Sequence, residues 1–169
     1  MPQRFTARAL TPVLALIATV STASAAETDI TIGMQLEPPH LDPTSAAAGA
    51  IDNVVYSNIF EGLTRFMGDG SVVPGLAKSW DISDDGLSYT FHLQGDVRFH
   101  DGSAMDAADV KFSLDRARAE DSTNAQKALF TGIADVAVID PLTVVLTLEA
   151  PNGNLLFNLA WGDAVIVAS

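Results

Sequence analysis

The 169-residue sequence carries 21 acidic and nine basic residues, which give a formal net charge of −12, and it contains no cysteine. So acidic a chain repels the phosphates of nucleic acids and the anionic head groups of lipids, which argues against nucleic acid as a partner. The lack of cysteine excludes disulfide bonds and thiolate metal sites, so the fold must depend on its apolar core.

The first 26 residues have the order of features found in a secretory signal peptide. Two arginines precede an apolar run over residues 9–20, and small residues follow as far as Ala26. The run is shorter than the roughly 20 apolar residues that a membrane span needs. We expect cleavage after Ala25 or Ala26. Because no cysteine is available for lipid attachment, we expect a periplasmic product that is not a membrane protein.

The next segment alternates apolar and polar residues and then changes to helical spacing. Residues 28–34 place Ile30, Ile32 and Met34 on one face, which predicts a strand with one buried face. From Ala50 onward, apolar residues recur at the spacing of an amphipathic helix. They are Ile51, Val54, Val55, Ile59 and Leu63.

Three short polar segments predict hairpins. Gly68-Asp69-Gly70 is interpreted as one hairpin tip, and residues 83–86 (SDDG) connect two segments with period-two patterning. We expect Trp80, which begins the first of these two segments, to be an anchor of the core. Asp140-Pro141 lies between the strands of the third hairpin. On its second strand one face is apolar, formed by Val144, Leu146 and Leu148.

A helix is predicted between the second and third hairpins. Asp106 and Asp109 have the spacing of a capping box, in which the first residue caps the helix and the second bonds back to it. The inward face of this helix is expected to carry Val110, Leu114 and Ala117.

The sequence contains no pattern typical of a catalytic centre. The histidines, His40, His92 and His100, lack the spacing of a helix-borne metal pair. Ser103 and Ser113 have no nucleophile-elbow motif around them. We interpret the neighbouring His100 and Asp101 as parts of a turn. The prediction is therefore a binding protein without catalytic residues, cofactor or metal.

Six motifs in order resemble the solute-binding protein family 5, which contains oligopeptide-, dipeptide- and nickel-binding proteins. They are Leu41-Asp42-Pro43, 58–63 (NIFEGL), 73–80 (VPGLAKSW), 85–93 (DGLSYTFHL), 97–102 (VRFHDG) and 107–114 (AADVKFSL). Each motif alone is weak, but six in this order and spacing make the resemblance specific.

The resemblance implies a mixed α/β fold of the periplasmic-binding-protein type II class, a clamshell of two lobes. Residues 1–26 would be the signal peptide, 27–50 the first strand and ligand-facing segment of lobe I, and 51–169 a small mixed α/β subdomain of lobe I. Because family members are much longer, we interpret the chain as an N-terminal fragment that lacks the second lobe and stops inside a strand over 163–169. Apolar side chains that would pack on the absent part are expected at the surface, namely Ile30, Ile32, Val165 and Val167.

The function implied by the resemblance is capture of peptides for an ABC import system. The protein would act as a monomer and deliver its solute to permease subunits of the inner membrane. A peptide backbone would pair with extended backbone at four small residues, Ala47, Ala48, Gly49 and Ala50. The open alternative for this segment is that residues 46–48 begin the following helix, since alanine favours helices.

Two further questions stay open at the level of sequence. Within the binding class, nickel, haem, an oligosaccharide or an opine are alternative ligands. The alternative to a binding protein is a secreted hydrolase whose catalytic residues lie in the missing C-terminal part.

The signal-peptide pattern generates the first prediction. Fractionation of cells and N-terminal sequencing should find a mature protein in the periplasmic fraction that begins at Ala26 or Glu27. A membrane-bound form that still carries Arg4 would contradict the interpretation.

Overall fold

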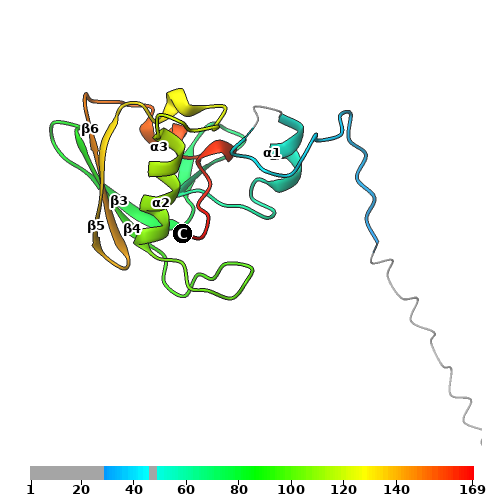
Figure 1. The fold of residues 1–169 in the computed structure, drawn as a ribbon, viewed down its shortest axis with the longest axis horizontal. Coiled ribbons are helices and arrows are strands. Elements are labelled where there is room, and N and C mark those ends of the chain that lie inside the picture. The colour runs from blue at the N-terminus through cyan, green and yellow to red at the C-terminus, as the bar shows by residue number, and fades with distance from the viewer. Residues whose placement is uncertain (1–28, 46–48) are drawn as a thin grey trace, which may run out of the picture. The chain divides into compact units, whose positions relative to one another are not determined.

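The computed structural model describes residues 29–45 and 49–169 (Figure 1). The chain divides into two units, Met1–Gly33, of which only residues 29–33 are described, and Met34–Ser169. Described residues 29–34 form no helix or strand, and Ile30 and Ile32 are 83% and 76% exposed. The strand predicted over 28–34 is therefore wrong in its described part, because a strand is stable only beside a partner and none of the described strands pairs with it. The exposure expected for these two isoleucines is confirmed.

The second unit contains two antiparallel sheets and several helices. The larger sheet has the order β3-β4-β6-β5, and the smaller one pairs β1 with β2. The strands are β1 (Thr64–Phe66), β2 (Val72–Pro74), β3 (Ala77–Ile82), β4 (Ser88–Leu93), β5 (Ile133–Asp140) and β6 (Thr143–Leu148). The helices are α1 (Gly49–Val55), α2 (Ala107–Arg118), α3 (Leu155–Asn158) and the 3-10 helices η1 (Lys127–Leu129) and η2 (Gly162–Ala164). None of the helices in the described part of the chain combines the length and apolar character needed to span a bilayer.

All three predicted hairpins are confirmed. They join β1 to β2, β3 to β4 and β5 to β6. In the second hairpin Gly86 has a φ of +69°, which glycine adopts at little cost. The Asp85 carboxylate there accepts bonds from the Ser83 hydroxyl at 2.6 Å and the Leu87 N–H at 3.0 Å. These local bonds explain why a short acidic segment specifies the turn.

Helix α2 begins at the predicted capping box. The Asp106 carboxylate accepts from the Ala108 N–H at 2.7 Å, and the Asp106 N–H donates to the Asp109 carboxylate at 2.9 Å. Val110, Leu114 and Ala117 are all buried, as predicted. This apolar face packs on the large sheet at β5 and β6 (Figure 1).

The core lies between α2 and the large sheet. Alternate residues of β4 and β6 are buried, so one face of each strand faces the core. These residues are Tyr89, Phe91, Leu93, Val144, Leu146 and Leu148. Trp80 on the edge strand β3 pairs with Phe91 at a ring-centroid distance of 6.3 Å but is only partly buried. The predicted contact of Trp80 with the core is therefore confirmed, but its indole is less buried than the prediction of a core anchor implied.

The helix predicted from Ala50 to Leu63 ends early, at Val55. Ser57 has a φ of +58°, and its N–H bonds the Phe60 carbonyl at 2.8 Å, which reverses the chain. Ile59 is consequently 43% exposed, whereas Leu63 is buried just before β1.

The strand predicted over 163–169 is also wrong. Residues 162–164 form η2, and Val165 makes a single β-bridge with Gly62. The Ile166 N–H donates to the Glu61 carbonyl at 2.9 Å. This contact with residues 61–62 leaves Val165 only 3% exposed, so the expected exposure is wrong for Val165, and Val167 is half-buried.

The packing of Trp80 on Phe91 generates the second prediction, which concerns the free energy of unfolding of the full gene product. Phe91→Ala should lower it by about 3–5 kcal/mol, because Phe91 is fully buried. Trp80→Ala should lower it by about 2 kcal/mol, since part of the indole already contacts water. The control, Ile82→Ala on the exposed part of the same strand, should cost less than about 1 kcal/mol. Urea unfolding would measure all three. Unchanged stability of Trp80→Ala would contradict the packing role.

Candidate functional site

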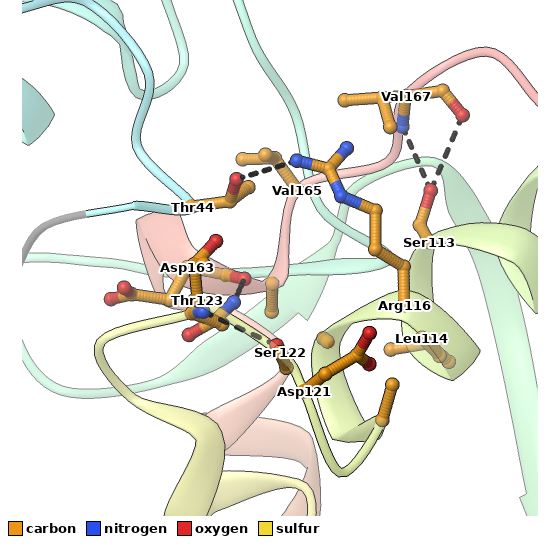
Figure 2. Close-up of a pocket in the computed structure, with 14 residues that line it drawn as sticks. Thr44, Ser113, Leu114, Arg116, Asp121, Ser122, Thr123, Asp163, Val165 and Val167 are labelled. Atoms are coloured by element: carbon orange, nitrogen blue, oxygen red, sulfur yellow. Dashed lines mark hydrogen bonds between the residues drawn. The ribbon is translucent and has the colours of Figure 1, made fainter.

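A cavity of about 230 Å³ lies where three segments of the second unit meet (Figure 2). Thr44 contributes one side, the C-terminal half of α2 and residues 119–124 a second side, and residues 163–167 the third. A neighbouring cavity of about 460 Å³ shares Thr44, Arg116, Val165 and Val167 and extends along residues 40–43. We call the two cavities together the Arg116 groove.

Arg116 links α2 to the segment that contains the Leu41-Asp42-Pro43 motif. Its Nη2 donates to the Thr44 hydroxyl at 3.1 Å (Figure 2). The Asp42 carboxylate accepts from the Thr44 N–H at 2.9 Å and from its hydroxyl at 2.7 Å. Burial alone would raise the pKa of Asp42, but these bonds and the Arg116 charge lower the pKa below its ordinary value. The turn therefore holds a charged carboxylate at neutral pH.

The C-terminal segment is held by polar contacts on the other side of the groove. The Ser113 hydroxyl accepts from the Val167 N–H at 2.9 Å and donates to the Val167 carbonyl at 3.2 Å (Figure 2). The Asp109 carboxylate accepts from the Ser169 N–H at 2.9 Å. Asn124, which is buried, donates to the Asp163 carbonyl at 2.9 Å. Helix α2 and the loop after it thus fix the backbone of residues 163–169.

The predicted ligand-facing residues lie before and at the start of α1. Ala47 and Ala48 lie outside the described residues. Gly49 and Ala50 are helical, so the extended backbone expected at these two positions is not observed. Gly49 is exposed, and nothing lies within 4 Å of the place that a Cβ would take. Contact between this segment and a ligand stays a prediction.

The other polar residues considered in the sequence lie in surface turns and strands. His100 and Asp101 form a turn, as predicted, in which the Asp101 carboxylate accepts from the Ser103 hydroxyl at 2.6 Å. His92 Nε2 lies 2.9 Å from the Asp81 carboxylate. Among residues 29–45 and 49–169, no group of three or more His, Asp and Glu side chains is arranged to hold a metal ion.

Asp163 is a group that the sequence interpretation missed. It is 5% exposed, and its Oδ1 has no hydrogen-bond partner within the described part of the protein. Burial raises the pKa of Asp163 to about 6, and the nearby negative charge of Asp52 on α1 adds to this effect. The Asp52 carboxylate lies against the Cα of Gly162, where any larger residue would clash with it. At neutral pH the chain therefore carries an unfavourable buried charge beside the groove.

Comparison with known proteins identifies related sequences over most of the chain. The family model "Bacterial extracellular solute-binding proteins, family 5 Middle" matches residues 71–167, more than half of the chain. The glutathione-binding protein GsiB of Pectobacterium atrosepticum is 41% identical over 128 residues, which are 76% of this chain and 25% of that protein. The di/tripeptide-binding protein 1 of Pseudomonas aeruginosa is 33% identical over 141 residues, with coverages of 73% and 26%. The chain thus spans about a quarter of the length of these curated relatives.

A solved structure resembles the chain in three dimensions as well. The binding protein AgaA of A. tumefaciens R10, in complex with agropinic acid, matches with a TM-score of 0.73 and 34% sequence identity. The match covers 78% of this chain and 26% of AgaA.

The buried carboxyl of Asp163 generates the third prediction. Folded Asp163 keeps its proton to a higher pH than the unfolded chain, so its contribution to stability falls as pH rises from about 4 to about 6. Asp163→Asn should remove this fall and raise the free energy of unfolding at pH 7, on the order of 1–3 kcal/mol. Urea unfolding of the full gene product between pH 4 and 8 would measure it, with Asp84→Asn in an exposed turn as control. A variant that is less stable than wild type at pH 7 would show that the charge has a partner.

Proposed function

Because the chain belongs to the bacterial extracellular solute-binding proteins of family 5, we propose that its gene product is the solute-capturing component of an ABC import system. The chain has the mixed α/β fold of one part of a type II periplasmic binding protein. In this proposal residues 27–50 and 51–169 belong to lobe I, and residues 1–26 direct export to the periplasm. The gene product binds its solute without chemical change and passes it to membrane permease subunits.

The proposed ligand class is small peptides, of which glutathione is the first candidate. The observation that carries this choice is the 41% identity to a glutathione-binding protein over 76% of the chain. The di/tripeptide-binding relative supports the same class.

The second candidate ligand is an opine. It is favoured by one observation, the likeness to AgaA in complex with agropinic acid at a TM-score of 0.73. In both cases we propose that the ligand approaches the start of α1, where the exposed Gly49 offers backbone without a side chain.

The fourth prediction is that the purified full gene product binds glutathione or a di- or tripeptide at micromolar or lower concentration. Calorimetric titration would compare reduced glutathione, a mixed dipeptide set, agropinic acid and the nickel–histidine complex under one buffer condition. The same samples would then be analysed by mass spectrometry for unchanged ligand.

Saturable binding with ligand recovered intact is the expected result. Binding of agropinic acid in place of any peptide would establish the second candidate. Cleavage of a peptide by the purified protein would contradict the proposal and favour a secreted hydrolase.

A further inference from the structure

One side of α2 carries polar residues that contact distant parts of the chain. Asp109, Ser113 and Arg116 follow one another at intervals of four and three residues, so they lie in a row along the helix. We call this row the α2 polar stripe. The row is displaced by one position from the buried apolar face of Val110, Leu114 and Ala117. Packing of the apolar face on the sheet therefore fixes where the stripe points.

Two members of the stripe hold the C-terminal segment and are themselves buried. Asp109 is 6% and Ser113 is 7% exposed. Asp109 bonds the Asp106 and Ser169 N–H groups, and Ser113 bonds both polar groups of the Val167 backbone. Replacement of either residue would leave part-buried backbone groups without these partners, which destabilises the fold. Their first role is structural.

Arg116 differs from the other two because it is exposed and holds a different segment. Its hydrogen bond to Thr44 joins residues that are 72 positions apart. The Thr44 hydroxyl accepts this bond and donates to Asp42, so the guanidinium, hydroxyl and carboxylate form one chain of bonds. An exposed guanidinium keeps its hydration when the contact is lost, so the fold should lose little stability. The contact can therefore fix the turn at 42–44 without being needed for folding.

The turn at 42–44 lines the larger cavity of the Arg116 groove and lies five positions before Gly49, the first residue of α1, which the proposed function places near the ligand. A binding segment that is held in position before the ligand arrives loses less conformational entropy on binding. Among the contacts of residues 40–45 in the described structure, the bond from Arg116 is the side-chain hydrogen bond that reaches them from another element.

We propose that Arg116 is a positioning residue for ligand binding, which acts through Thr44 and Asp42 on the turn at 42–44. The inference rests on the proposed function, since it needs a solute that binds beside this turn. It assigns Arg116 no contact with the ligand. Loss of the guanidinium should therefore weaken binding no further than loss of the Thr44 hydroxyl does.

The fifth prediction tests this coupling with Arg116→Gln, Thr44→Val and the double variant of the full gene product, with glutathione as the probe. Each single variant should weaken binding roughly tenfold, as expected for one hydrogen bond to a charged group. The double variant should be no weaker than Thr44→Val alone, because loss of the Thr44 hydroxyl already removes the Arg116 contact together with the bond to Asp42. The matched control is Arg98→Gln, which removes another exposed arginine with one bond, to the Gly102 carbonyl at 2.8 Å, and should bind as wild type.

Two further measurements test the positioning role of Arg116 independently. Melting temperatures distinguish it from a role in folding, and hydrogen exchange tests it without any ligand. Melting temperatures of the Arg116 and Thr44 variants should stay within a few degrees of wild type. Amide hydrogen exchange without ligand should be faster at Thr44 in Arg116→Gln, because its N–H bond to Asp42 depends on the held turn.

The possible results decide the inference in each case. Unchanged affinity in Arg116→Gln, additive losses in the double variant, or a collapse of the melting temperature would each overturn it. If the wild-type protein binds no member of the ligand panel, the proposed function fails. Hydrogen exchange at Thr44 then still tests whether Arg116 holds the turn at 42–44. Faster exchange in Arg116→Gln than in wild type supports this role, and unchanged exchange overturns it.

Discussion

The large sheet meets the apolar face of α2 at β5 and β6, and the positions of the other segments follow from this packing. Phe91 and Leu146 on the strands and Leu114 on the helix are almost completely buried. Close packing of this kind permits little rotation of the helix, because every shifted side chain would leave a cavity or a clash. The polar side of α2 is therefore fixed as firmly as its apolar side. The C-terminal segment and the turn at 42–44 are both attached to that polar side.

The parts of the fold that could be predicted from the sequence are those with local causes. The three hairpins depend on turn residues that bond within their own segment, as Asp85 does with Ser83 and Leu87. The start of α2 depends on a capping box that spans three residues. The family resemblance adds the fold class, which the comparisons confirm.

The parts that could not be predicted depend on partners or on single backbone angles. Residues 29–34 have the alternation of a strand, but pairing requires a second strand that the pattern does not supply. α1 ends where Ser57 takes a positive φ, which serine rarely does. Val165 is covered by a segment about a hundred positions earlier, at Gly62. The sequence indicates on which side of α2 Arg116 lies. It does not indicate that Thr44 lies beside Arg116.

The Arg116 groove is the place where the chain departs from what stability alone requires. Asp163 costs free energy at neutral pH, because burial and the charge of Asp52 both oppose its ionisation. An asparagine has nearly the same shape and no charge, so folding alone gives no reason for a carboxylate at this position. The exposed bond between Arg116 and Thr44 contributes little to stability. Residues whose identity is not explained by stability are typical of functional sites. Asp163 and Arg116 are two such residues, and both line the cavity between α2 and the segments that it holds.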